Sequence, residues 1–181
     1  MTLVEVMVAG ALGSVVLVVV VSLWMFSARC FASLGNYSDL DSKSRQALDS
    51  MLRDIRDATR ISSFQRDGTN NWITLTNAQI AGVMITYAWS SSSRKLVRQK
   101  TGQPDRVYLT ECDVWDFHPY QRTPQTNGTY LFYPATNSSG NYDASICKLI
   151  DVTWKCSRTI LGNKINTESV QTAQVVLRNK Q

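Results

Sequence analysis

Residue types on which many enzymes and metal sites depend are scarce in this 181-residue sequence. It has one histidine, His118, and its four cysteines form no Cys-x-x-Cys pair, which disfavours a zinc site. It also lacks a glycine-rich phosphate loop and any histidine near a nucleophile in a recognisable catalytic motif. We therefore expect no enzyme activity, no metal and no cofactor, and we interpret His118 as a sheet or turn residue.

Charged residues are absent from Val6 to Ala28, a run rich in valine and leucine. A helix of that length spans roughly 35 Å at about 1.5 Å per residue, enough to cross a hydrocarbon core of about 30 Å. Because no Lys or Arg precedes the run, we expect that a basic leader has already been removed. Residues 1–28 are therefore predicted to cross a membrane, with the polar remainder beyond it.

Proline is absent from residues 1–60, and the segment 29–60 continues the helix with a different pattern. Its apolar residues recur every three or four positions, including the stripe of Leu48, Leu52 and Ile55, while mixed charges occupy the opposite face. The sequence predicts one helix over residues 1–60, about 90 Å long at about 1.5 Å per residue, with Gly35 as its weakest point.

Residues 61–181 have the character of a β-rich head. Short runs of β-branched and aromatic residues alternate there with Gly, Asn, Ser and Pro clusters. This order predicts an α+β fold, in which the long helix packs on a mostly antiparallel sheet. We expect Pro119–Ser145 to be a long surface loop with one minor strand. The predicted strands are Trp72–Thr76, Val83–Trp89, Lys95–Gln99, Val107–Thr110, Val114–His118, Tyr130–Tyr133, Leu149–Lys155 and Val170–Leu177.

One ionisable residue, Glu5, interrupts the apolar N-terminus. A carboxylate near the start of a helix is favoured by the helix dipole, so Glu5 has a purely local interpretation. The alternative is that Glu5 pairs with the α-amino group of Met1, from its own or a neighbouring copy, since an unpaired charge in a membrane is costly. Such pairing would align parallel helices, and the small residues Gly10, Gly13 and Ser14 would let them approach closely.

The stretch from Thr2 to Ala9, TLVEVMVA, resembles the start of mature type IV pilins and type II secretion pseudopilins. The resemblance implies that a prepilin peptidase has cut before Met1 and methylated it. It also implies that the chain waits in the inner membrane until an ATPase-driven machine extracts it into a filament of identical copies. Two departures are Met1, where the family usually has Phe, and Ser22, where many major pilins have a helix proline.

Three functions remain open. The first is a subunit of a type IV pilus-like filament at the cell surface. The second is a minor pseudopilin of a periplasmic type II secretion filament, because the order of elements in the head is loosely similar to the J-type pseudopilins and W-type minor pilins. The third is a single-span membrane anchor that carries an adhesive or sensory head.

The basic run Arg94–Arg106 allows a nucleic-acid partner, because Lys and Arg neutralise phosphates. Basic residues also protect the exposed edge of a hairpin from unwanted strand pairing. We favour this second interpretation. A nucleic-acid partner stays possible, and no other feature of the sequence supports it.

The cysteines allow a disulfide in the head. If Val114–His118 pairs antiparallel with Leu149–Lys155, Cys112 lies opposite Cys156, and we predict a disulfide between them. Cys147 is about 30 Å from Cys156 along an extended strand, too far for a bridge. Cys30 is expected to be a thiol buried in helix packing.

Overall fold

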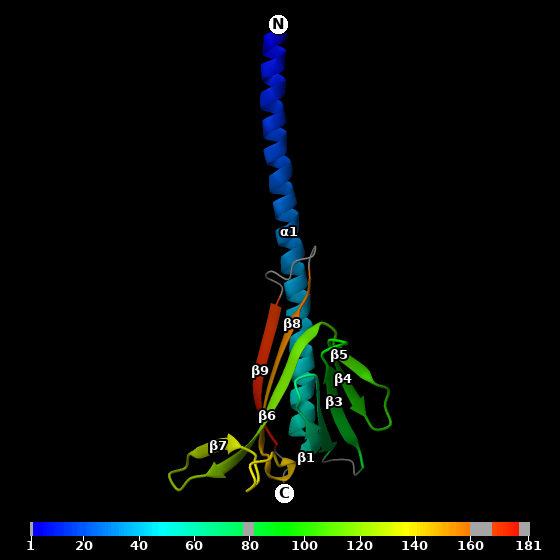
Figure 1. Cartoon of the computed structure of the whole chain (residues 1–181), viewed down its shortest axis with the longest axis vertical. Coiled ribbons are helices and arrows are strands. Elements are labelled where there is room, and N and C mark those ends of the chain that lie inside the picture. The colour runs from blue at the N-terminus through cyan, green and yellow to red at the C-terminus, as the bar shows by residue number, and fades with distance from the viewer. Residues whose placement is uncertain (1, 78–81, 160–167, 178–181) are drawn as a thin grey trace.

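The computed structural model describes residues 2–77, 82–159 and 168–177. A single 54-residue helix, α1 (Leu3–Arg56), runs the length of the molecule, and the head surrounds only its C-terminal half (Figure 1). The helix passes through Gly35 without a break and ends four residues earlier than expected, because the chain enters a strand at Ala58. The predicted α+β fold, a long helix packed on an antiparallel head, is confirmed.

The head contains two antiparallel sheets where the sequence suggested one. The first has the order β1-β2-β3-β4-β5, and the second has the order β7-β6-β8-β9. The strands are β1 (Ala58–Gln65), β2 (Asn70–Asn77), β3 (Met84–Ser90), β4 (Lys95–Lys100), β5 (Arg106–Leu109), β6 (Cys112–Pro124), β7 (Tyr130–Pro134), β8 (Leu149–Ser157) and β9 (Glu168–Val176), with a short 3-10 helix, η1 (Ala144–Ile146), before β8.

All eight strands expected from the sequence are present, and one was missed. The missed strand is β1, which the prediction divided between the end of the helix and a loop. The predicted surface loop Pro119–Ser145 is partly wrong, because β6 continues to Pro124 and pairs with β7. The last half of α1 also belongs to the core of the head, as expected for a helix that packs on the sheet.

The core lies between α1 and the two sheets. Helix residues Leu40, Ala47, Met51 and Ile55 are buried at helical spacing and pack with buried strand residues of both sheets. Leu48 and Leu52, predicted to face the sheet, lie at the edge of this cluster and are half-buried. The predicted stripe is therefore on the correct side of the helix, but the most deeply buried line of residues runs through Met51 rather than through Leu48 and Leu52.

The pairing of β6 with β8 follows the predicted register. Trp115 lies opposite Trp154, and Cys112 lies opposite Cys156. Ile150, Val152 and Trp154 are buried on one face of β8, as their alternation with Asp151, Thr153 and Lys155 predicts.

Candidate functional site

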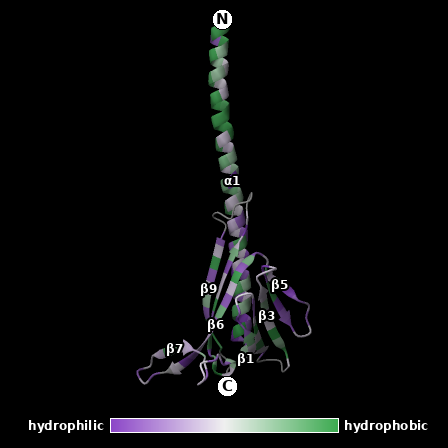
Figure 2. Cartoon of the chain, viewed as in Figure 1, coloured by the Kyte–Doolittle hydropathy of each residue, from purple (hydrophilic) through white to green (hydrophobic). Residues whose placement is uncertain are grey.

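The N-terminal half of α1 projects from the head, and no other element of the described part of the chain covers it. Every large apolar side chain from Leu3 to Leu34 is between 45% and 77% exposed. Figure 2 shows this half as a mostly hydrophobic rod that extends beyond the mixed surface of the head. Within the described part of the chain, α1 is the one helix long and apolar enough to cross a membrane. It fits a transmembrane helix and is compatible with membrane anchoring.

Glu5 closes a capping box at the start of α1. The backbone N–H of Thr2 donates to Glu5 Oε2 at 2.8 Å, and the backbone N–H of Glu5 donates to Thr2 Oγ1 at 3.4 Å. The two residues thereby satisfy each other's N–H groups at the end of the helix. This is the local role that its position in the first turn suggested. Met1 lies outside the described residues, so the pairing of Glu5 with the Met1 amine stays a prediction.

The small residues Gly10, Gly13 and Ser14 lie on the exposed part of the helix. No atom outside the helix lies within 4 Å of where a Cβ on Gly10 or Gly13 would be. The Ser14 hydroxyl donates to the carbonyl of Ala11 at 2.7 Å and so is satisfied within the helix. These positions offer a surface to another helix, and their role in helix packing stays a prediction.

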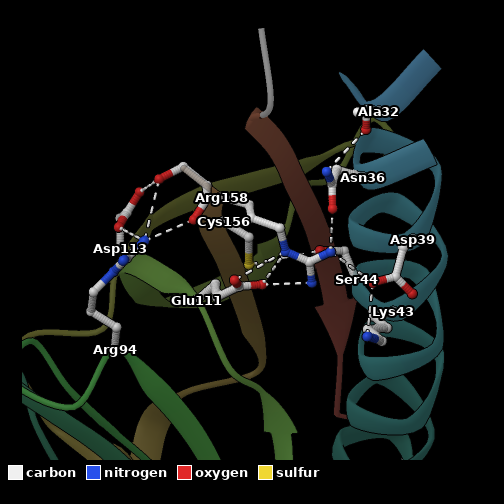
Figure 3. A network of polar contacts seen from close by, with 11 residues as sticks. Ala32, Asn36, Asp39, Lys43, Ser44, Arg94, Glu111, Asp113, Cys156 and Arg158 are labelled. Carbon is white, nitrogen blue, oxygen red and sulfur yellow. Dashed lines mark hydrogen bonds and ion pairs between the residues drawn. The ribbon is translucent and has the colours of Figure 1, made fainter. Parts of the chain in front are cut away.

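A polar cluster holds α1 at the point where it enters the head. We call it the collar, and it consists of Asn36, Asp39, Glu111 and Arg158 (Figure 3). Arg158, just after β8, donates to Glu111 at 2.9 Å, to Asn36 Oδ1 at 2.8 Å and to Asp39 Oδ2 at 3.1 Å. The hydrogen bond to Glu111 is the main cause that raises the pKa of Arg158. The collar marks the boundary between the exposed and packed halves of the helix.

Inside the head, Asp54 joins α1 to the first sheet. Arg98 donates to it through Nε at 2.7 Å and through a terminal nitrogen at 3.0 Å, and the Tyr87 hydroxyl donates to it at 2.5 Å. Burial raises the pKa of Tyr87, and the Asp54 charge adds to that effect. Two planar, charge-assisted bonds to Arg98 fix the rotation of the helix as well as its position.

The basic run Arg94–Arg106 is partly occupied by contacts within the head. Arg98 pairs with Asp54, and Arg94 pairs with Asp113 at 2.5 Å and donates to the Ser157 carbonyl at 2.8 Å. Two of its guanidinium groups are therefore used in folding, which favours the structural interpretation over phosphate binding.

Cys112 and Cys156 are buried and face each other across β6 and β8. The backbone N–H of Ser157 donates to the Glu111 carbonyl at 3.0 Å, which identifies the cysteines as a non-hydrogen-bonded pair. Such pairs bring the Cα atoms to about 4.5 Å, within the range that a disulfide spans. Both are thiols in this structure, and the disulfide stays a prediction. Cys30 is exposed in the single chain, and its burial in helix packing stays a prediction.

The described residues contain no group of three His, Cys, Asp or Glu side chains arranged to hold a metal ion. His118 is half exposed, with Nε2 3.4 Å from Asp116 Oδ2, and Asp116 accepts two hydrogen bonds from Arg66. Burial acts to raise the pKa of Asp116, but the hydrogen bonds and charge of Arg66 outweigh burial and lower it.

The collar and the Asp54 contacts were not anticipated from the sequence. Asp39 and Arg158 are 119 residues apart, and no periodicity or motif links them. No protein-family model, no curated protein and no solved structure matches this chain.

Proposed function

We propose that this chain is a subunit of a type IV pilus-like filament, anchored in a membrane before assembly and polymerised through the N-terminal half of α1. The observation that carries the proposal is the unpartnered apolar surface of that half. A membrane covers it before assembly, and parallel helices of neighbouring copies cover it afterwards. Prepilin peptidase and an ATPase-driven assembly machine would be the partners of such a subunit.

The length of the exposed apolar surface favours a filament over a simple anchor. From Leu3 to Leu34 the helix covers about 48 Å at about 1.5 Å per residue, whereas a hydrocarbon core is about 30 Å thick. Phe31 and Leu34 remain 74% and 65% exposed beyond Arg29, the first basic residue. A bundle of identical helices would bury these residues too, which a bilayer alone would not.

The second candidate is a minor pseudopilin of a type II secretion filament. It would use the same kind of helix, but fewer copies would be present in each filament. The third candidate, a membrane-anchored adhesive or sensory head, requires no contact between helices. Glu5 distinguishes the polymerising functions from the anchor, because a carboxylate that only caps a helix does not need its charge.

The test compares Glu5→Gln with Glu5→Ala in the cells that make the protein. Gln still accepts the Thr2 N–H and keeps the cap, but it removes the charge, whereas Ala removes both. If Glu5 pairs with an amine of a neighbouring copy, both variants stay in the membrane fraction while the wild type appears in sheared filaments. Immunoblots of the sheared and membrane fractions, with subunit counts per filament, provide the measurement.

Assembly of Glu5→Gln at the wild-type level would reduce Glu5 to a helix cap. A wild-type chain found only in the membrane fraction would contradict a cell-surface filament and favour the anchor or the periplasmic pseudopilin. A chain present at a few copies per filament would favour the minor pseudopilin.

A further inference from the structure

A slot lies beside the packed half of α1, between that helix and β5. It is lined by helix residues between Lys43 and Arg53 and by Arg106, Val107 and Tyr108 of β5, and its volume is about 260 Å³. A water molecule occupies about 30 Å³ of the liquid, and pockets for small organic ligands start at about 300 Å³. The slot therefore has room for one or two side chains of a partner.

The lining of the slot carries more positive than negative charge. Its charged residues are the three cations Lys43, Arg53 and Arg106 and the one carboxylate Asp49. Lys43 is paired with Asp39 at 2.8 Å. The guanidinium groups of Arg53 and Arg106, in contrast, form no ion pair with any carboxylate of the described residues. Arg106 is held 5.5 Å from the centre of the Tyr108 ring. Two guanidinium groups are thus left to bind an oxyanion, for which their planar fork is suited.

The rest of the lining favours a polypeptide as the source of that oxyanion. Gln46, Asp49 and Ser50 offer acceptors to peptide N–H groups, and Val107, 46% exposed, offers an apolar wall. A peptide carries N–H groups and apolar side chains beside its carboxylates. A nucleic-acid backbone is anionic throughout, so it would bring a phosphate close to Asp49, and its binding depends on a series of phosphate contacts.

We propose that the slot between α1 and β5 binds an acidic segment of a different protein, whose carboxylates pair with Arg53 and Arg106. A second copy is poorly suited, because each copy has a net charge of +5 and like charges repel at an interface. The contact uses side chains, so it does not require β5 to accept a further strand, which Arg106 disfavours. The inference goes beyond the proposed filament, because an anchored head would present the same slot.

Peptide binding to the full chain in a non-ionic detergent tests the slot. The probe is a labelled peptide of alternating Glu and Ala, compared with one of alternating Gln and Ala, and fluorescence anisotropy measures the affinity. We expect the Glu peptide to bind and the Gln peptide not to bind. Because both guanidinium groups are exposed, Arg53→Gln and Arg106→Gln should each weaken binding about threefold, and the double variant about tenfold.

Arg56→Gln is the matched control. Arg53 and Arg56 both lie in the last turn of α1, so either change removes one positive charge from the same end of the helix. Only Arg53 lines the slot. At an ionic strength of about 0.1 M, charges more than about 10 Å apart are largely screened, so Arg56→Gln should change the affinity less than about 1.5-fold.

Equal weakening by Arg53→Gln and Arg56→Gln would indicate attraction to the net charge of the chain and would overturn the slot. Failure of the Glu peptide to bind would overturn it too. Tighter binding of an oligothymidylate, lost in the same double variant, would assign the slot to nucleic acid and overturn the acidic polypeptide. None of these results bears on the proposed filament, which the sheared fractions test separately.

Discussion

The two halves of α1 have the same secondary structure and opposite surroundings. From Leu3 to Leu34 every large apolar side chain is exposed, whereas Met51 and Ile55 of the same helix are each 1% exposed. The first half has no charge after Glu5 until Arg29, and the second half has a charged face and an apolar stripe. The stripe is buried within one chain, whereas the uniformly apolar half would be covered by lipid or by other helices.

Two groups of polar contacts attach the packed half of α1 to the head. The collar and the Asp54–Arg98–Tyr87 contacts attach the second half to both ends of the head. A force applied to the first half would therefore be transmitted to the head through ion pairs rather than through a flexible joint. This arrangement would suit the proposed filament subunit, which an assembly machine pulls out of a membrane.

The largest expected effect separates two methionines of the same helix. Met51→Ala should lower the free energy of unfolding by about 2–5 kcal/mol, because it leaves a cavity in the core. Met25→Ala should change it by less than about 0.5 kcal/mol, because Met25 is 48% exposed and lies in the projecting half of the helix. Urea unfolding of the full chain in detergent, followed by tryptophan fluorescence, provides the measurement. Equal effects at the two sites would break the comparison.

The cysteines of the head and of the exposed half of α1 should differ in reactivity. Oxidised protein should contain one peptide pair linked through Cys112 and Cys156, while Cys30 in the exposed half reacts at once with a thiol reagent. Reduction of the bridge should lower the free energy of unfolding by about 2–4 kcal/mol. A non-reducing peptide map identifies the bridge, and Cys112→Ser should remove it. Finding Cys147 in the bridge would contradict the prediction.

Asp54 tests the attachment of the packed half. Asp54→Asn keeps an acceptor for Tyr87 but removes the charge that Arg98 faces, so we expect a loss of about 2 kcal/mol for this half-buried pair. Asp49→Asn is the matched control on the exposed face of the same helix and should cost less than about 0.5 kcal/mol. The same urea unfolding measures both. Equal losses would mean that helix charge in general, rather than this ion pair, stabilises the head.

Local patterns in the sequence predicted most of the fold. The absence of proline predicted one continuous helix, and the alternation in β8 predicted its buried face. The pairing of β8 with β6 was an assumption made to place the cysteines, and the structure has it. β1 was missed because ATRISSFQ lacks a clean alternation, and its identity as a strand depends on pairing with β2. Contacts between distant residues, such as Arg158 with Asp39, depend on how the two sheets close around the helix. Sequence reasoning found Glu5 but not the collar for the same reason.

The smallest expected effect concerns Asp39, at the boundary between the two halves. Hydrogen bonds from Lys43 and then from Arg158 lower the pKa of Asp39 below its ordinary value of 3.8. Because this pKa is lower in the folded state than in the unfolded state, the stability that it contributes is complete above pH 3.8 and is lost as the pH falls through the lowered value. The carboxyl resonance of Asp39 should titrate with a midpoint below 3.8 in NMR spectra. In Arg158→Met the Asp39 pKa should move back toward 3.8, though not fully, because Lys43 remains. An unchanged titration in that variant would mean that Lys43 alone lowers the pKa of Asp39 and that Arg158 does not pair with it.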